Sequence, residues 1–446
     1  MLKMLILTFI SFVLAASLAY SQETPPELTP VDSLEDPPEL TQIVPLVTPY
    51  PYPYNNPDTA SLSAAIMKSK TKKMFDKIEI MDVPSLSGRN DVKFVEDRGN
   101  FKFGFYPQKK AAPLVFIIAD MAGSYVSGYM MYEADLLHQN GYNVITISSP
   151  FFWNFIISSS KTALPGVTDE DAVDMYTVMQ LALAKVKSKH KAPITKIGLM
   201  GIGFGGLLAA HISALEQQQN KLDIKRYLLI NPVVNVLHAI TEIETRAALS
   251  LDMDKHRINW MVVKAAEFVM KNMESEYRVN DSDYFLNLEK KFPLTDTEYK
   301  FLTGAALRMN IGDVIYASQL VNDLGVLKSK ISRFRKAARH DEVEKMGFVG
   351  YMRNLLIPYF SKKYPKLIDL IKHANFNYVR KEVMQNQNIY LMHNADDFLV
   401  TPDQLTYLKN TFGPERSQIY PLGGHLGNMW FPDNQNHVLK VMSVLK

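Results

Sequence analysis

Two polar residues near the carboxyl end of the chain have the types and the setting for acid–base chemistry. Asp397 lies in the loop at residues 393–402, after an apolar run, and His425 lies in a glycine-rich loop after the next such run. A carboxylate that accepts a hydrogen bond from an imidazole fixes its tautomer and stabilises the imidazolium, so the histidine can act as a general base. These two residues therefore predict one half of a site for nucleophilic catalysis.

The turn at residues 201–206 is where the nucleophile of such a site is expected. It reads Gly-Ile-Gly-Phe-Gly-Gly, follows an apolar run and leads into an apolar helical pattern. A strand, a glycine-dense turn and a helix are the context of the nucleophile elbow, written G-x-S-x-G. Gly203 stands where the serine belongs. Without a hydroxyl no acyl-enzyme forms, and any remaining turnover would use water activated by His425.

The same six residues also match G-x-G-x-x-G, the pattern of a phosphate-cradling loop. That pattern needs an acidic residue after the following strand to bind the ribose, but the next apolar run ends in Asn231 and Pro232. The sequence therefore disfavours dinucleotide binding. The nearest other hydroxyls, Ser124 and Ser127, lack a G-x-S-x-G context, and capping of the following helix is their simpler role.

Apolar runs that alternate with helical patterns must position these loops. Such alternation is typical of a parallel sheet covered by helices, preceded here by antiparallel strands. The strands are expected at 77–83, 92–95, 101–106, 114–119, 143–147, 196–200, 226–230, 388–392 and 418–421. The helices around them are expected at 60–75, 127–140, 169–187, 205–218, 402–410 and 434–445.

With the three loops in the chain order nucleophile, acid, histidine, residues 77–446 resemble the α/β hydrolases. The closest resemblance is to bacterial esterase-like members with an Asp-Asp acid loop and a Gly-Gly-His-x-Gly histidine loop. It implies an α/β-hydrolase fold: a mostly parallel, doubly wound sheet with a large helical cap insertion. It also implies an oxyanion hole made by the backbone N–H groups of Phe204 and Met121. Where the family usually has His-Gly, this chain has Ala119-Asp120, which puts a carboxylate beside a site meant to hold negative charge.

The chain divides into four parts by composition. Residues 1–21 have a positive start, an apolar run and a small-residue cleavage site, as in a secretory signal peptide. Residues 22–59 are a proline-rich linker. Residues 60–232 and 388–446 form the hydrolase core, and residues 233–387 form a helical cap insertion. We expect an exported bacterial protein, periplasmic or secreted, with no integral membrane segment after signal cleavage.

Composition excludes several other classes of protein. A formal net charge of +3 on 446 residues is too small for a nucleic-acid-binding surface. The chain has no cysteine, which excludes disulfides and thiol catalysis, and its dispersed histidines predict no metal site. No cofactor is expected.

These observations predict a non-catalytic or weakly active pseudohydrolase that binds a small acyl-type ligand or a protein partner in the retained pocket. The alternative is an active ester, lipid or peptide hydrolase that uses Asp397 and His425 with water or an unorthodox nucleophile.

Overall fold

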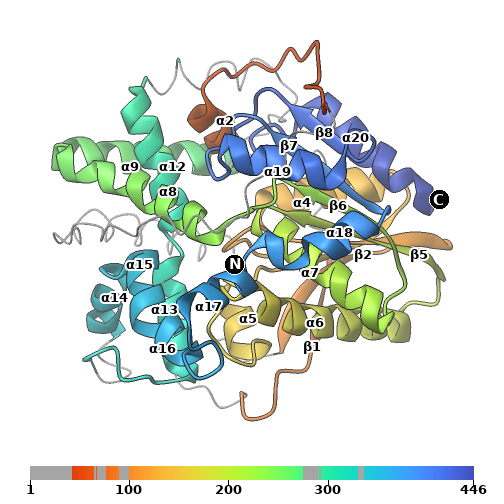
Figure 1. Ribbon diagram of the computed structural model, residues 1–446, viewed down its shortest axis with the longest axis horizontal. Helices are drawn as coiled ribbons and strands as arrows, with labels where there is room; N and C mark the ends of the chain where they lie inside the picture. The colour runs from red at the N-terminus through yellow and green to blue at the C-terminus, as the bar shows by residue number, and fades with distance from the viewer. Residues whose placement is uncertain are drawn as a thin grey trace.

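An eight-stranded sheet organises the molecule (Figure 1). The computed structural model describes residues 43–64, 67, 77–89, 100–274, 290, 293–329 and 336–446. The strand order is β1-β2-β4-β3-β5-β6-β7-β8, antiparallel at β1–β2–β4 and parallel elsewhere. The strands are β1 Glu79–Val83, β2 Phe101–Tyr106, β3 Ala112–Ile118, β4 Asn143–Ile147, β5 Ile194–Ile202, β6 Ile224–Ile230, β7 Ile389–Asn394 and β8 Ser417–Tyr420.

The sheet follows from apolar runs that are buried on both faces. Every residue of β3 and β4 is buried, as expected for central parallel strands. Successive side chains of β3 enter different cores, since Leu114 and Phe116 join one cluster and Val115 and Ile117 join the other. Each strand predicted from the sequence is present, except that the run 92–95 lies outside the described residues.

Helices cover both faces of the sheet. Helices α6 and α7 contribute to the first cluster, and α4 and α20 to the second. Helix α5 is short and was not predicted, because its apolar sequence has no helical period. The helices that cover the two faces are α4 Gly128–Gln139, α5 Trp153–Ser158, α6 Thr168–Lys189, α7 Phe204–Gln219, α19 Pro402–Phe412 and α20 Pro432–Met442.

Apart from loops and turns, the described residues between β6 and β7 form helices and no strand. Most of these helices gather at one end of the sheet, whereas α18 lies beside α7 (Figure 1). Helix α8 packs on the loop after β7, where the guanidinium of Arg246 lies 3.8 Å from the centroid of the Phe398 ring. None of the helices in the described part of the chain is long and apolar enough to span a bilayer. The helices are α8 Val236–Ala248, α9 Lys255–Glu274, α12 Asp296–Arg308, α13 Ile311–Val321, α14 Lys336–Glu344, α15 Gly347–Tyr351, α16 Ile357–Phe360, α17 Leu367–Ala374 and α18 Arg380–Gln385, with shorter turns at η2 Leu249–Asp252, η3 Met352–Leu356 and η4 Phe376–Val379.

Residues 43–63, here called the N-terminal strap, pack against the sheet. Most of this stretch was expected to be linker, but Tyr52 and Tyr54 are only 5% and 2% exposed. The backbone N–H of Val47 donates to the carbonyl of Ile419 in β8 over 2.9 Å. The rings of Tyr50 and Tyr52, alternate residues of the strap, pack against the ring of Phe431. The strap ends in helix α2, Pro57–Ser63.

Candidate functional site

A sharp turn joins β5 to α7 at Gly203. Its backbone has φ 56° and ψ −121°, a region that favours glycine. Close packing holds the turn against the sheet, because a Cβ added at Gly205 would lie 2.5 Å from the carbonyl oxygen of Ile118 in β3. The turn therefore has the strand–turn–helix geometry predicted for residues 201–206, with no side chain at its centre.

The Asp120 carboxylate lies directly over this turn. Asp120 follows β3, and its Oδ1 accepts the backbone N–H of Phe204 over 2.7 Å. A Cβ added at Gly203 would lie 2.9 Å from Oδ2 of Asp120 and closer still to its Oδ1 and Cγ. The carboxylate thus occupies the space of a side chain at position 203 and takes the donor predicted for the oxyanion hole. The N-terminus of a helix binds anions favourably, and at α7 the anion is the Asp120 carboxylate of the same chain.

His425 lies between two carboxylates. Its Nδ1 is 2.9 Å from Oδ2 of Asp397, and its Nε2 is 3.2 Å from Oδ2 of Asp120. Burial alone would lower the pKa of His425, but Asp397 and Asp120 outweigh it and raise that pKa to about 10. The side chain is 4% exposed. The imidazole is therefore protonated at neutral pH and donates to both carboxylates.

The acid loop uses its two aspartates differently. Asp397 Oδ2 also accepts from the Asn231 side chain over 2.7 Å, and its Oδ1 accepts the N–H of Leu399 over 3.0 Å. Burial raises the pKa of Asp397, but His425 outweighs burial and leaves it below its ordinary value. Asp396 instead accepts the N–H groups of Gly423 and Gly424, over 3.1 and 2.8 Å. The structure thus brings Asp397 to His425 and uses Asp396 to hold the histidine loop.

Helix α2 of the strap supports the histidine loop from outside. Ser61 Oγ accepts the backbone N–H of His425 over 2.8 Å, and Ser63 Oγ donates to the carbonyl of Gly427 over 3.0 Å. Asp58 on the same helix forms a buried ion pair with Arg246 of α8. Sequence reasoning missed these residues, because only the tertiary fold brings a segment so near the amino end to a loop more than 360 residues later.

The remaining residues predicted for the site lie in the turn after β3. Met121 follows Asp120, and its side chain is partly buried against the main core. The Asp120 N–H donates to the hydroxyl of Tyr129 over 3.1 Å, which fixes the backbone of the turn. Ser127 holds the N-cap position of α4, but the expected side-chain cap is not made, because its Oγ instead accepts the N–H of Ser124 over 2.9 Å. These two serines stabilise the turn.

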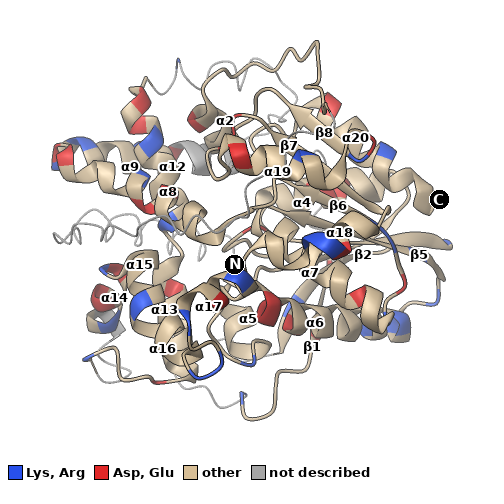
Figure 2. Ribbon diagram, in the orientation of Figure 1, with Lys and Arg blue, Asp and Glu red and all other residues tan. Residues whose placement is uncertain are grey.

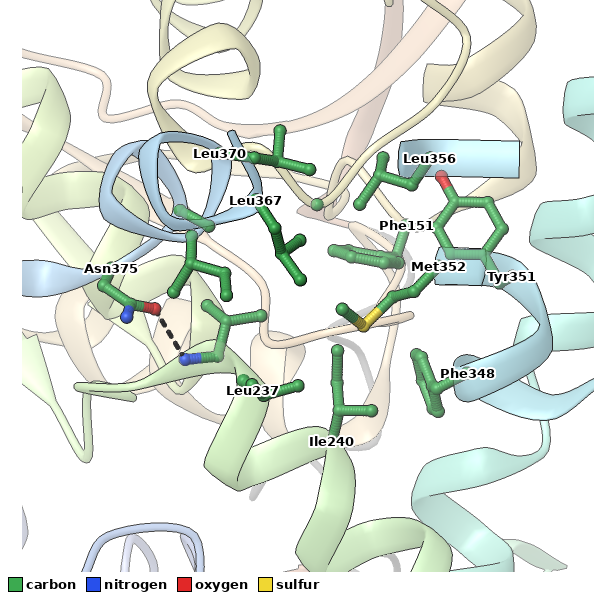
Figure 3. A pocket seen from close by; sticks show the side chains of 14 residues that line it. Phe151, Leu237, Ile240, Phe348, Tyr351, Met352, Leu356, Leu367, Leu370 and Asn375 are labelled. Carbon is green, nitrogen blue, oxygen red and sulfur yellow. Dashed lines mark hydrogen bonds between the residues drawn. The ribbon is translucent and has the colours of Figure 1, made fainter. Parts of the chain in front are cut away.

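An apolar cavity of about 30 Å³ lies beside the site, between the helical insertion and the core (Figure 3). Its polar wall group, the Asn375 side chain, already accepts the N–H of Val236 over 2.9 Å. Phe151 forms part of the wall, and its ring meets the ring of Phe204 edge to face at 5.1 Å. The other lining residues are Gly166, Val236, Leu237, Ile240, Phe348, Tyr351, Met352, Leu356, Leu367, Leu370, Ile371 and Ala374. Within the described ranges, no three acidic or histidine side chains converge as a metal site would require.

The elbow, the acid loop after β7 and the histidine loop after β8 occur in the order expected for a triad hydrolase. Residues 169–284, which include the elbow, match the model of a family described as alpha/beta hydrolase fold. The chain has an α/β-hydrolase fold. No curated protein sequence matches it.

Several solved structures are similar to this α/β-hydrolase-fold chain. An acylaminoacyl peptidase of Pyrococcus horikoshii is 12% identical with a TM-score of 0.39, and the match covers 83% of this chain and 41% of the peptidase. An esterase of Pyrococcus furiosus is 10% identical with a TM-score of 0.38, covering 85% of this chain and 95% of the esterase. A thioesterase domain from the curacin biosynthetic pathway is 11% identical with a TM-score of 0.35, and the match covers 82% of this chain and 99% of the thioesterase domain. Identities this low transfer no activity.

Proposed function

We propose that this protein is an exported, non-catalytic member of the α/β-hydrolase superfamily that binds an acyl-type ligand. The observation that carries the proposal is the position of Asp120, whose carboxylate meets the Phe204 N–H, crowds Gly203 and pairs with His425. Serine acyl transfer needs a hydroxyl and an open oxyanion hole at these places. In this chain the Asp120 carboxylate occupies both the space of the missing side chain at position 203 and the Phe204 N–H of the oxyanion hole.

The state of His425 supports the same conclusion. A general base must be unprotonated at the working pH, and the best catalytic pKa lies near that pH. The pKa of His425 is about 10, so the imidazolium predominates at neutral pH. Water activation by His425 in this state is therefore weak, which disfavours hydrolysis by a water mechanism.

The apolar cavity supports ligand binding. Hydrophobic lining with few polar groups is typical of sites for apolar ligands. The cavity lies between α8 and α17 of the insertion and Phe151 of the core, one ring away from the elbow. Its volume of about 30 Å³ is small, so an acyl chain would bind there with α17 displaced outward.

Export completes the proposal and rests on residues 1–21, which lie outside the described residues. Expression in a bacterial host, followed by N-terminal sequencing of the protein from periplasm and medium, tests it. A mature protein that begins at Gln22 would support export. A protein found only in the cytoplasm with Met1 retained would contradict it.

The test of catalysis compares four full-length proteins: wild type, Gly203→Ser, Asp120→Gly and the double variant. Each is treated with a fluorophosphonate probe, and labelling at residue 203 is scored by mass spectrometry. We expect labelling only of the double variant, because the new hydroxyl needs the space and the N–H that Asp120 now holds. Labelling of a serine in the wild type would refute the non-catalytic proposal. Circular dichroism of all four proteins controls for folding.

A second candidate function is favoured by the contact between Asp120 and His425. The Asp120 carboxylate could attack an alkyl carbon of an epoxide or alkyl halide and form an alkyl ester. The carbon–halogen bond would break to release halide, or the ring carbon–oxygen bond would break to leave an alkoxide that takes a proton from the His425 imidazolium or from solvent. The ester removes one negative charge beside His425, which would lower its pKa and allow it to activate water. Attack of that water on Cγ, with the oxyanion at the Phe204 N–H, would release an alcohol and restore the carboxylate.

The second candidate has its own experiment. In a His425→Gln variant the ester would form and persist, so incubation with a 1,2-epoxyalkane should add the mass of one epoxide molecule, as a hydroxyalkyl ester, to the peptide that contains Asp120. An unmodified peptide in both wild type and variant would exclude this function and leave the binding protein.

A further inference from the structure

The corner of the molecule formed by α16, α17 and the turn between them is exposed, basic and apolar at once. Residues 358–374 contain four lysines and one acidic residue, Asp369. Tyr359, Leu367 and Ile368 in the same stretch are 39%, 44% and 38% exposed. Here we call Tyr359, Lys362, Lys366, Leu367, Ile368 and Lys372 the basic-apolar corner. Figure 2 shows lysines and arginines around the labels α16 and α17.

The local structure explains why these side chains face outward together. The turn is tight, since the N–H groups of Lys363 and Tyr364 both donate to the carbonyl of Phe360. Helix α17 buries Leu370, Ile371 and Ala374 on its inner face. Leu367 and Ile368 begin the helix directly after Lys366 and stay 44% and 38% exposed, although Leu367 shares the face of Leu370 and Ile371 and also lines the cavity. Two aliphatic side chains are therefore presented to solvent beside cationic groups.

The two acidic groups of α6 nearest the corner have partners other than the corner lysines. Glu170 pairs with Lys363, and Asp169 lies 3.1 Å from His373, so both carboxylates are engaged with partners outside the corner. Lys362, Lys366 and Lys372 are exposed. Asp369 is the exposed carboxylate within the stretch. The three exposed lysines of the corner therefore outnumber Asp369, the one carboxylate of the stretch.

We propose that the basic-apolar corner docks on an anionic lipid bilayer. Leu367, Ile368 and Tyr359 would enter the head-group region, and the lysines would lie at lipid phosphates. Stable association with a bilayer generally needs two signals, of which apolar insertion and a basic patch are one pair. The exposed aliphatic side chains beside the lysines favour a lipid surface over an acidic peptide, because a bilayer offers both phosphates for the lysines and an apolar interior for Leu367 and Ile368.

The corner also lies beside the apolar cavity. Leu367 lines the cavity and is 44% exposed, so its side chain stands between the cavity and the surface. Met352 and Leu356, at the ends of a π-helical turn, line the cavity wall. A bilayer at the corner would present acyl chains at this entrance. The docking proposal itself is independent of whether the Asp120 site is catalytic.

Co-sedimentation with vesicles tests the proposal on protein purified from an exporting host. Vesicles of phosphatidylglycerol and phosphatidylcholine are compared with phosphatidylcholine alone, at 50 and 500 mM salt. We expect binding to the anionic vesicles only, weakened at high salt. Each lysine near a lipid surface is worth about fivefold in affinity. Lys362→Glu/Lys366→Glu should therefore weaken binding by at least about 25-fold, and Asp369→Asn should strengthen it.

Matched controls separate the corner from general effects of charge and apolar surface. Lys187→Glu/Lys189→Glu reverses two exposed lysines at the end of α6, and Leu181→Ser removes an apolar side chain that is 41% exposed. Both should bind like wild type, whereas Leu367→Ser/Ile368→Ser should lose binding at high salt. All variants have the same N-terminus, so a difference in vesicle binding between them reports on the substituted residues and not on the N-terminal segment. Equal binding by corner and control variants, or no binding to anionic vesicles, would overturn the proposal. The proposal would also be overturned if the protein formed a dimer that Leu367→Ser dissociates, because the corner would then bind a second copy of the chain.

Discussion

The Asp120 carboxylate and the Gly203 backbone occupy adjoining space that leaves no room for a side chain at position 203. Two departures from the hydrolase pattern, glycine for serine and aspartate for glycine, are thus physically coupled. A serine at the elbow excludes this position of the carboxylate, and the carboxylate excludes the serine.

Restoring the serine alone should therefore destabilise the protein. Gly203→Ser adds a side chain at positive φ and against Asp120, and we expect a loss of roughly 3 kcal/mol in the free energy of unfolding. Asp120→Gly/Gly203→Ser should recover part of this loss. Urea denaturation of both single variants and the double variant measures the coupling. Additive effects would show that the two positions do not share space in solution.

Stability should fall as the pH rises from 6.5 to about 10. The pKa of His425 is about 10 in the folded protein and 6.5 ordinarily. A group whose pKa is raised on folding stabilises the folded state fully below its ordinary pKa, here 6.5. That stabilisation is lost as the pH rises through the pKa of the folded protein. Urea midpoints across this range measure the effect. His425→Gln should remove the His425 component of the slope, and an unchanged slope in that variant would contradict the assignment.

Breaking the ion pair between Arg246 and Asp58 should loosen the strap. Both side chains are buried, so Arg246→Met leaves an unpaired carboxylate and should cost about 3–5 kcal/mol. Amide hydrogen exchange at residues 57–63 should rise more than exchange in β5. The matched variant Arg246→Met/Asp58→Asn removes both charges and should be milder. Equal exchange in wild type and Arg246→Met would show that the pair does not hold α2.

Removing the Ser61 hydroxyl should affect the histidine loop. Ser61→Ala leaves the N–H of His425 without its acceptor, at a cost of about 1–3 kcal/mol. Ser188→Ala, on an exposed turn of α6, should change stability by less than about 0.5 kcal/mol. Thermal unfolding of the two variants compares them directly. Equal melting temperatures would mean that the His425 N–H finds another acceptor.

The sequence predicts the sheet well because each strand is a local apolar run. Of the two aspartates of the acid loop, Asp397 contacts His425 and Asp396 accepts the N–H of Gly423, and the catalytic role of Asp397 stays a prediction. Both results depend on short-range pattern: runs of four to nine residues and the offset of a carboxylate from the end of its strand.

The contacts of Asp120 and of the strap could not be predicted in the same way. Asp120 and Phe204 are 84 residues apart, and Asp120 and His425 are 305 apart. The sequence shows a carboxylate near the oxyanion loop but not that its side chain turns inward onto the elbow. For the strap, the proline content predicts a linker but does not reveal the surface that its tyrosines cover.

The bond between Ser61 and the backbone of His425 joins positions 364 residues apart. Contacts of this length raise the contact order of the chain and slow its folding. During synthesis the strap emerges early but finds its partners only after β8 and the histidine loop have been made. The strap and the loop that it supports can therefore close only when the chain from Ser61 through His425 is available. For a chain that we propose is exported, such a delay would keep the precursor open for transport.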